Sequence, residues 1–280
     1  MALGLPTLSP GNPRTDVQGP VCVAHRGASH RAPENTMAAV HGGLRAGADA
    51  VEVDVRRTRD GALVLMHDTT LVRTTDVRRV YPDRAPWRLH DFTFAELQRL
   101  DAGSWKSRRH LGEPIPQLEH AIEVVRRAGA GLLVEVKTPE LYPGVVEDVL
   151  AALSAVPGSL DTSLPQQQLA VQSFDFAAMK ELKSSAPRVT VGLLGAPPIA
   201  QLPVLASWAD QINPHHAWVD HDYLTRLRDL GLCCQVWTPD RSIDMRRVLQ
   251  LGVDGVVSNR PDKLLRHRAS IGGSPFARQQ

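Results

Sequence analysis

The chain has 280 residues, of which 42% are hydrophobic and 22% charged, and its formal net charge at pH 7 is +2. This size and apolar content are typical of one globular domain, and the nearly balanced charge, with arginines scattered rather than clustered, argues against nucleic-acid binding. Three cysteines, Cys22, Cys233 and Cys234, are too few for a disulfide framework and are expected as small buried residues. No apolar run has the length of a membrane span, so we expect a soluble protein without stable membrane insertion. The lack of a disulfide framework agrees with an expected cytoplasmic location.

Residues 1–19 are rich in proline, glycine and polar side chains and lack the basic start and apolar centre of a signal peptide. They are predicted to form a disordered tail. The first expected strand, residues 21–25, leads into the turn His25-Arg26-Gly27. Histidine has the ordinary pKa nearest neutrality, and arginine presents a planar set of donors that matches phosphate oxygens. The simpler alternative is a strand that ends in a solvated basic turn.

The next expected strand, residues 50–55, carries two acids, Glu52 and Asp54. They share one face because side chains alternate along a strand. The rest of this strand is apolar, and a buried carboxylate without a positive partner is strongly unfavourable. A structural ion pair would explain one such acid, whereas two in alternation, with no lysine or arginine between them, favour a metal ion.

Asp60-Gly61 is a strong signal for a two-residue hairpin turn between this strand and the apolar run that follows. Counting outward from the turn pairs Arg59 with Ala62 and sets Asp54 opposite His67. The returning strand is therefore expected to bring His67 beside the two acids. Without this register, a lone histidine at a strand end is more simply a surface residue.

A third acid, Glu135, ends the apolar strand expected at residues 132–136, and Lys137 follows on the same face. These two side chains could simply pair with each other. The position of Glu135 at the end of a strand nevertheless matches that of the earlier acids. This suggests three carboxylates converging on a hard divalent cation, Mg²⁺ or Ca²⁺, while Lys137 faces a phosphate.

The order and spacing of these motifs resemble the glycerophosphodiester phosphodiesterase family over about residues 21–261. The resemblance is carried by His25-Arg26-Gly27, Pro33-Glu34-Asn35-Thr36, Glu52-x-Asp54, Asp60-Gly61 followed by His67-Asp68, Glu135-x-Lys137, Ser173-Phe174 and Trp237-Thr238. It implies an α/β fold, a TIM (β/α)8 barrel with a small insertion after the second strand. It also implies metal-dependent hydrolysis of a small-molecule glycerophosphodiester to sn-glycerol 3-phosphate and an alcohol.

Within this reaction we expect a divalent cation on Glu52, Asp54 and Glu135 to act as a Lewis acid. Arg26 and Lys137 are expected to offset negative charge on the phosphoryl oxygens.

Two histidines, His25 and His67, are expected to share the proton transfers. The resemblance implies that His25 accepts and His67 donates, although the residues themselves do not assign these roles. Glu34 is expected to orient Arg26 or its loop. Trp237 could cover the glycerol carbons or simply pack at a strand end. Direct attack by water and a cyclic phosphate intermediate both remain open at this point.

The alternation of strands and helices supports the barrel independently, since it indicates a parallel sheet with right-handed crossovers. We expect one barrel domain over residues 20–265, with catalytic groups at the carboxyl ends of its strands. The expected strands are 21–25, 50–55, 132–136, 169–174, 189–194, 209–213, 232–237 and 254–257, and helical patterns include 118–128, 145–153, 176–183, 223–230 and 243–251.

Residues 69–116 break this alternation and are predicted to be the insertion, which would overhang the site and select the alcohol group. A helix is expected at residues 94–100 with Thr93 as its N-cap. Residues 266–280 are expected to form a C-terminal tail. Four aromatic residues of the insertion are expected to form its own small core: Trp87, Phe92, Phe94 and Trp105.

Two alternatives to this function stay open. One is a lysophospholipase D-type phosphodiesterase with the same catalytic set, and the other is a non-catalytic barrel that binds a metal or a phosphate ester. Asp240, which stands where the family commonly has asparagine, is expected to lie outside the catalytic shell. The sequence indicates no oligomeric state.

Overall fold

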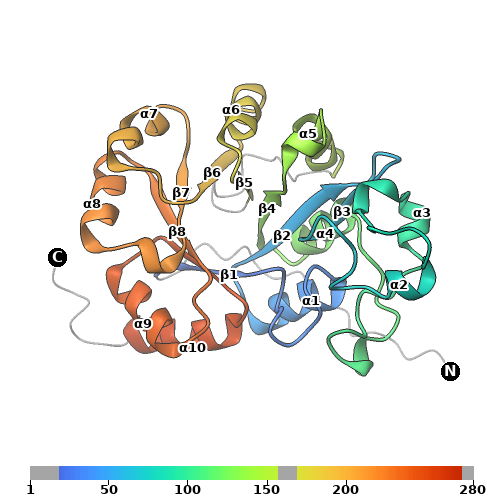
Figure 1. Ribbon diagram of the computed structural model, residues 1–280. Helices are drawn as coiled ribbons and strands as arrows, with labels where there is room; N and C mark the ends of the chain where they lie inside the picture. Colours follow the sequence, from blue (N-terminus) through green and yellow to red (C-terminus); the bar gives the residue numbers. More distant parts are fainter. Residues whose placement is uncertain (1–18, 157–168, 273–280) are drawn as a thin grey trace.

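A closed barrel of eight parallel strands forms the centre of the computed structural model, which describes residues 19–156 and 169–272 (Figure 1). Each strand overlaps a segment predicted from the sequence. The barrel strands are β1 (Val21–Ala24), β2 (Ala50–Arg57), β4 (Gly131–Val136), β5 (Leu169–Ser173), β6 (Thr190–Leu194), β7 (Gln211–Asn213), β8 (Cys233–Trp237) and β9 (Gly255–Ser258). Because β1 pairs with both β2 and β9, the sheet closes, and the predicted TIM barrel is confirmed.

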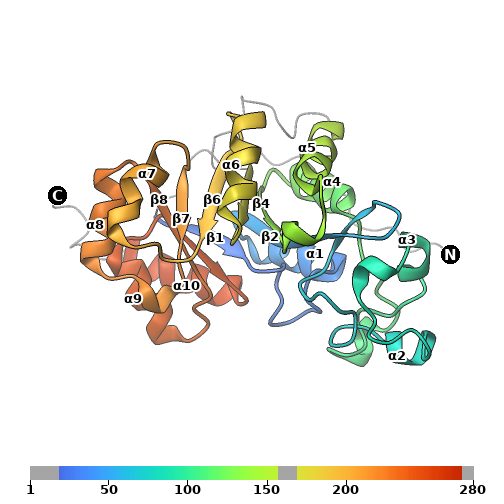
Figure 2. The same cartoon turned by 45° about the horizontal axis from the view of Figure 1, so that its top comes forward.

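Helices cover the outside of the barrel (Figure 2). They are α1 (Met37–Ala46), α4 (Leu118–Arg127), α5 (Val145–Ala155), α6 (Phe176–Ser185), α7 (Leu202–Ala206), α8 (His221–Asp229), α9 (Ser242–Leu251) and α10 (Pro261–Gly272), with short 3₁₀ turns η3 (Pro139–Leu141), η4 (Ile199–Gln201) and η5 (His216–Trp218). The five helical patterns singled out in the sequence agree with these bounds to within two residues at each end.

The strands are buried on both faces, and their alternation separates two environments. Outward side chains such as Val51, Val53 and Val55 pack against the helices. Inward side chains form a small apolar floor inside the barrel: Val23, Ala50, Leu133, Ala170 and Val257. Since side chains of one face recur every second residue, Glu52 and Glu135 lie directly above this floor, each two residues further along its strand than Ala50 and Leu133.

The hairpin register predicted from Asp60-Gly61 is wrong by one residue. Strand β3 (Leu63–Leu65) runs antiparallel to β2 with Val55 opposite Leu65, so Met66, and not His67, lies opposite Asp54.

A turn of three residues instead of two causes this shift. The amide of Thr58 donates to the carbonyl of Ala62 at 2.9 Å, and that of Gly61 donates to the carbonyl of Thr58 at 3.1 Å. Gly61 has a φ of +89°, the left-handed conformation that closes such a three-residue loop. The hydroxyl of Thr58 stabilises the turn by bonding Asp60 and the amide of Ala62.

The segment between β3 and α4 contains α2 (Val77–Val80), η1 (Leu89–Asp91), α3 (Phe94–Leu97) and η2 (Arg108–His110), and it lies beside the β2–β3 hairpin (Figure 1). Its separate hydrophobic cluster consists of Val64, Met66, Leu71, Val77, Leu89, Phe92, Leu97, Leu100, Ala102 and Ile115.

Three of the four aromatic residues predicted for this cluster contribute to it. Phe92 is fully buried, and Trp87 and Phe94 pack at the edge. Trp105 does not, because its side chain lies at the surface, 38% exposed, with its indole bonded to the carbonyl of Ala102. Thr93 caps α3 as predicted.

Two predicted boundaries differ from the structure. Helix α3 ends at Leu97, three residues before the predicted end. The tail expected at 266–280 begins inside α10, because Leu265 and Ile271 pack against the core and Arg268 pairs with Asp49. The rest of that tail, and residues 1–18 of the expected N-terminal tail, lie outside the described residues.

The three cysteines are free thiols; Cys22 and Cys234 are buried as predicted, and Cys233 is half-buried. Within the described ranges, none of the helices is both long and apolar enough to span a bilayer.

Candidate active site

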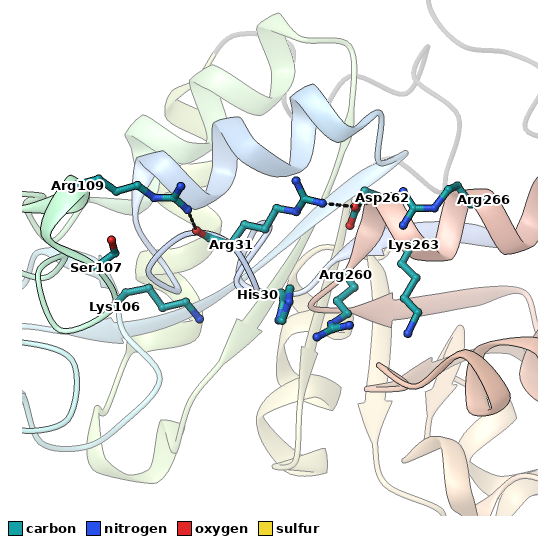
Figure 3. A pocket seen from close by; sticks show the side chains of 9 residues that line it. All are labelled: His30, Arg31, Lys106, Ser107, Arg109, Arg260, Asp262, Lys263 and Arg266. Carbon is teal, nitrogen blue, oxygen red and sulfur yellow. Dashed lines mark hydrogen bonds and ion pairs between the residues drawn. The ribbon is translucent and has the colours of Figure 1, made fainter.

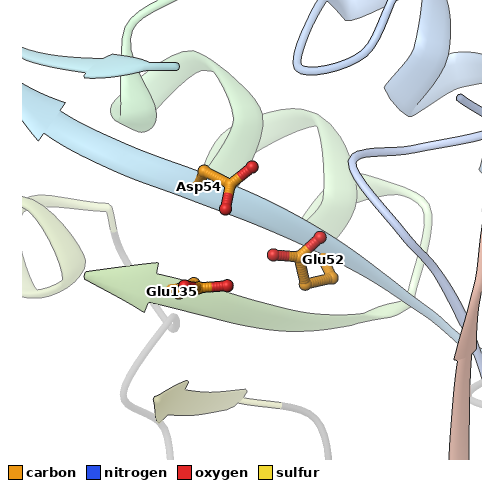
Figure 4. Close-up of side chains that lie close together, drawn as sticks. All are labelled: Glu52, Asp54 and Glu135. Atoms are coloured by element: carbon orange, nitrogen blue, oxygen red, sulfur yellow. The ribbon is translucent and has the colours of Figure 1, made fainter. Parts of the chain in front are cut away.

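Three carboxylates from two adjacent strands meet inside the barrel (Figure 4). Glu52 and Asp54 lie on β2, and Glu135 lies on β4 directly opposite Asp54. Each offers an oxygen within 4.8 Å of the others, and none is more than 7% exposed. The predicted convergence of these acids is therefore present in the structure.

The three acids carry more negative charge than their surroundings neutralise. Burial, followed by the neighbouring carboxylates, raises the pKa of Glu52 well above its ordinary value and that of Glu135 to about 7. For Asp54 burial acts in the same direction, but Arg26 and then Lys137 outweigh it and lower the pKa to about 2. Negative charges that are buried this close together inside the barrel require a positive partner.

Two cations reach the acids. The Nε of Arg26 lies 3.0 Å from Asp54, and another of its nitrogens lies 2.8 Å from Glu34. The ammonium of Lys137 lies 2.6 Å from Glu135 and 3.6 Å from Asp54. Lys137 thus forms the pair with Glu135 that the sequence left open, and it also faces the rest of the cluster.

The donor set fits a divalent cation. One oxygen of Glu52 and one of Asp54 are buried and accept no hydrogen bond within the described residues. The three carboxylates face only two cations, of which Arg26 is shared with Glu34. Carboxylate oxygens are the ligands that Mg²⁺ and Ca²⁺ prefer, so these residues could hold such an ion.

The turn after β1 places Arg26 against the acids. Arg26 and Gly27 have φ values of +53° and +78°, and the amide of Arg26 donates to Glu52 at 2.8 Å. A Cβ on Gly27 would lie 2.2 Å from the backbone of Ala39 in α1. Only glycine fits this close approach, which explains the third residue of the His-Arg-Gly motif.

His25 lies beside the acids and is held from the opposite side. Its Nδ1 lies 2.7 Å from Oδ1 of Asn259, and its Nε2 lies 3.9 Å from Glu52. The amide nitrogen of Asn259 donates to Asp240 at 2.6 Å, so the amide oxygen faces the imidazole. Since an amide oxygen only accepts, the proton is on Nδ1 and Nε2 has a free lone pair. Burial, and then Arg26, lower the pKa of His25 to about 4.

His67 also lies at the site despite the changed hairpin register. Its Nδ1 lies 2.7 Å from the carboxylate of Asp68, and Arg56 donates two hydrogen bonds to its carbonyl. Burial lowers the pKa of His67, while Asp54 and the hydrogen bond that His67 donates to Asp68 act to raise it. The two histidines thus differ in partner, an amide for His25 and a carboxylate for His67.

Arg73 links the two sides of the site and was not anticipated from the sequence. Its guanidinium donates to Asp68 at 2.7 Å and to both oxygens of Glu34 at 2.7 and 2.8 Å. Because Glu34 also accepts from Arg26, one chain of ion pairs connects the partner of His67 with the partner of Asp54. The expectation that Glu34 contacts Arg26 agrees with this geometry.

Asn35 and Asn259 are further polar residues that sequence reasoning missed. Asn35 donates to the carboxylate of Asp54 at 2.7 Å and accepts from its amide at 3.1 Å. Asn35 lies in one of the recognised motifs, and Asn259 directly follows a barrel strand, so both carried a usable signal. Asp240 does not touch His25, but it holds Asn259 and is therefore closer to the chemistry than expected.

An aromatic wall, defined as Phe174, His215, Trp218 and Trp237, lines the ends of β5, β7 and β8. The ring of Trp237 lies 6.0 Å from Phe174 and 5.1 Å from His215, and its indole nitrogen bonds the carbonyl of Asn213 at 2.9 Å. Phe174 and Trp218 are more than half exposed. This wall offers an apolar surface for carbon atoms of a ligand.

Comparisons with known proteins agree with this geometry. The model of the glycerophosphoryl diester phosphodiesterase family matches residues 25–263. A glycerophosphodiester phosphodiesterase of Caldanaerobacter subterraneus is 30% identical over 251 residues, which is 87% of this chain and 95% of the relative. Another, from Bacillus subtilis, is 33% identical over 256 residues, covering 86% of this chain and 83% of the relative.

Solved structures show the same fold. A phosphodiesterase of Oleispira antarctica in complex with the product sn-glycerol-3-phosphate superimposes with a TM-score of 0.76 at 31% identity, over 89% of this chain and 96% of that one. A glycerophosphodiester phosphodiesterase structure from Agrobacterium tumefaciens gives a TM-score of 0.70 at 28% identity, over 87% and 98% of the two chains.

Proposed function

This chain belongs to the glycerophosphoryl diester phosphodiesterase family, and from that membership we propose that it hydrolyses glycerophosphodiesters to sn-glycerol 3-phosphate and an alcohol with the help of a divalent cation and two histidines. The observation that carries the proposal is the buried cluster of Glu52, Asp54 and Glu135 between His25 and His67, each histidine oriented through its Nδ1. Because the family consists of phosphodiesterases, we no longer consider the non-catalytic barrel that the sequence left open.

Glu52, Asp54 and Glu135 are the residues that would hold the cation. When bound there, a divalent cation polarises the phosphoryl group and makes an attacking hydroxyl more acidic. The orphaned oxygens of Glu52 and Asp54 support this assignment, because each would gain a partner.

Positive side chains would bind the phosphate beside this cluster. Arg26 presents a fixed guanidinium through its pairs with Glu34 and Asp54. Lys137 is held between Asp54 and Glu135 and would reorient one of its three N–H groups toward a phosphoryl oxygen. Both charges are in place before the reaction, which is how preorganised groups lower a barrier.

His25 suits the role of proton acceptor. Asn259 fixes the proton on Nδ1, which leaves the Nε2 lone pair directed at the side where Glu52 lies. A neutral imidazole with this orientation can remove a proton from the attacking hydroxyl.

His67 suits the role of proton donor to the leaving alcohol. The ionised carboxylate of Asp68 on Nδ1 stabilises the imidazolium that a donor requires more strongly than the neutral amide oxygen of Asn259 does for His25. Arg73 holds that carboxylate in place. The two different partners thus support this assignment of acid and base.

In the balanced reaction, the phosphorus–oxygen bond to the alcohol breaks and water supplies the new oxygen and the two protons. The water can attack directly, or the glycerol hydroxyl can attack first and water then opens a cyclic phosphate. Detection of cyclic glycerophosphate by ³¹P NMR during turnover separates the two routes.

The test is an assay with glycerophosphocholine that measures sn-glycerol 3-phosphate and choline. Release of both products in equal amounts, abolished in His25→Ala and retained in His41→Ala, a histidine on α1, is the expected result. Release of glycerol and phosphocholine instead, or no turnover with any added divalent cation, would refute the proposal.

A further inference from the structure

A pocket of about 490 Å³ lies beside the candidate active site, and the reaction described above uses none of its lining residues. Figure 3 shows the side chains that line it. It is built by the turn after β1, by the start of α10 and by the segment between β3 and α4. Six of its lining side chains are cationic: Arg31, Lys106, Arg109, Arg260, Lys263 and Arg266. We call this the basic pocket.

The basic pocket concentrates positive charge. Its single acid, Asp262, is shared between Arg31 at 2.9 Å and Arg266 at 3.4 Å. The whole chain has a net charge of only +2, so this pocket is far more positive than the average surface. A concave wall of one charge sign focuses its electrostatic field and attracts an oppositely charged ligand.

Most of the cations in the basic pocket keep their charge available. Lys106 donates to the carbonyl of Ser29 at 2.8 Å and Lys263 to the carbonyl of Asp240 at 3.1 Å, contacts that orient the ammonium groups without neutralising them. Among the described residues, the guanidinium of Arg260 makes no ion pair or side-chain hydrogen bond. Such groups are poised for a phosphate, which guanidinium and ammonium donors both recognise.

The position of the basic pocket ties it to the reaction. His30 in its wall donates its backbone N–H to the carbonyl of Asn259, the residue that holds His25. Arg260 directly follows Asn259, and the loops after β1 and β9 belong to the catalytic end of the barrel. The pocket therefore lies on the β1–β9 side of the site, whereas the aromatic wall lies at β5, β7 and β8.

We propose that the basic pocket binds a second phosphate group on the alcohol part of the substrate. The inference rests on the proposed function and adds a substrate class, namely glycerophosphodiesters whose leaving alcohol carries a further phosphate. The glycerol to be retained lies against the aromatic wall, and the scissile phosphate lies at the acids. The alcohol that His67 protonates extends along the segment after β3, which supplies Lys106 and Arg109, so that its further phosphate lies in the basic pocket. A cationic alcohol such as choline gains nothing from this pocket.

A matched pair of substrates tests the proposal. In bis(glycerophospho)glycerol the leaving alcohol carries a second phosphodiester, and in glycerophosphoglycerol it is uncharged. After correction for the two equivalent scissile bonds, kcat/KM should favour the first by about tenfold at low salt. The preference should shrink between about 0.01 M and about 1 M salt, as the screening length falls from about 30 Å to about 3 Å.

Charge-removing variants locate the effect. Arg260→Gln should lower the ratio of the two kcat/KM values by about tenfold, and Arg266→Gln, which lies on α10 and away from Asn259, should lower it in the same direction. Arg241→Gln is the matched control, since Arg241 is 80% exposed after β8 and does not line the pocket. The ratio of the two kcat/KM values in Arg241→Gln should equal the ratio in the wild type.

Equal kcat/KM for the two substrates in the wild-type enzyme would overturn the proposal and leave the proposed function intact. Loss of binding to phosphatidylglycerol vesicles in Arg260→Gln with an unchanged ratio would also overturn it, because the pocket would then serve a lipid surface. Hydrolysis of neither these two substrates nor glycerophosphocholine would refute the proposed function itself. In that case calorimetric binding of bis(glycerophospho)glycerol to wild type and Arg260→Gln still decides the ligand of the pocket.

Discussion

His25 and Asn259 are 234 residues apart in the chain, yet Nδ1 of the imidazole lies 2.7 Å from the amide oxygen. The contact exists because β1 and β9 are neighbours where the barrel closes. Asp240 holds the amide nitrogen of Asn259 and so prevents the amide from turning over. The orientation of His25 therefore depends on a carboxylate that the imidazole never touches.

Asp240→Ala should lower kcat by about tenfold or more with little change in KM, because Asn259 loses its acceptor and His25 loses its fixed tautomer. The ¹⁵N shifts of the His25 ring should then show a mixture of Nδ1–H and Nε2–H forms. Asp244→Asn, on nearby α9, is the control and should behave as wild type. Unchanged ring shifts together with unchanged kcat would remove Asp240 from the positioning network.

Removal of divalent cations should abolish turnover, and added Mg²⁺ or Ca²⁺ should restore it, because Glu52, Asp54 and Glu135 repel one another without a shared cation. The thermal midpoint should also rise with the cation, by the equivalent of about 2.7 kcal/mol at a hundred times Kd. Glu135→Gln should reduce this rise, whereas Glu123→Gln on α4 should not. Full activity in exhaustively chelated enzyme would contradict the metal site.

His67→Ala should lower kcat by about two to four orders of magnitude while the fold stays intact by circular dichroism. The loss should be larger for an alkyl alcohol than for nitrophenolate, which needs little protonation to leave. Asp68→Asn should show the same leaving-group pattern with a smaller loss, since it removes only the carboxylate that supports the imidazolium. Equal losses with both leaving groups would count against His67 as the donor.

The acid cluster could be predicted from the sequence because it depends on local regularities. The alternation of side chains places Glu52 and Asp54 on one face, and the rule that barrel sites lie at strand ends brings Glu135 to them. The hairpin register could not be predicted from the sequence, because Asp60-Gly61 fits a two-residue and a three-residue loop equally well. Only the bonds made by Thr58 select the longer loop.

Contacts between segments that are far apart in the sequence were harder to predict. Asn259 meets His25 only through barrel closure, Asp240 acts on His25 only through Asn259, and no local pattern encodes these pairings. Trp105 failed as a core residue because aromatic content does not reveal which face of a short irregular segment is covered. The roles of the site residues in the reaction remain predictions that the variants above address.

The cluster around Phe92 should contribute substantially to stability. Phe92 is fully buried within the segment between β3 and α4, so Phe92→Ala should lower the free energy of unfolding by about 3–5 kcal/mol. Leu111→Ala, at a side chain that is 75% exposed in the same segment, should change it by less than about 0.5 kcal/mol. Urea denaturation measures both. Similar values for the two variants would mean that the cluster does not unfold together with the barrel.

Substrate preference between water-soluble diesters and lysophospholipids follows from the surfaces around the site. The aromatic wall exposes Phe174 and Trp218, but two rings form a small patch suited to a glycerol unit, and the β1–β9 side of the site is the basic pocket. An acyl chain needs a broad apolar surface to leave water. Glycerophosphocholine and glycerophosphoethanolamine should therefore be better substrates than lysophosphatidylcholine.

Glycerophosphocholine and lysophosphatidylcholine form a matched pair, because they share the leaving alcohol and differ only in the acyl chain. We expect a higher kcat/KM for glycerophosphocholine when both are measured below the micelle-forming concentration. A tenfold preference for the lyso-lipid, equivalent to about 1.4 kcal/mol in the transition state, would contradict this expectation. Phe174→Ala and Trp218→Ala would then identify the aromatic wall as the acyl-binding surface if they removed that preference.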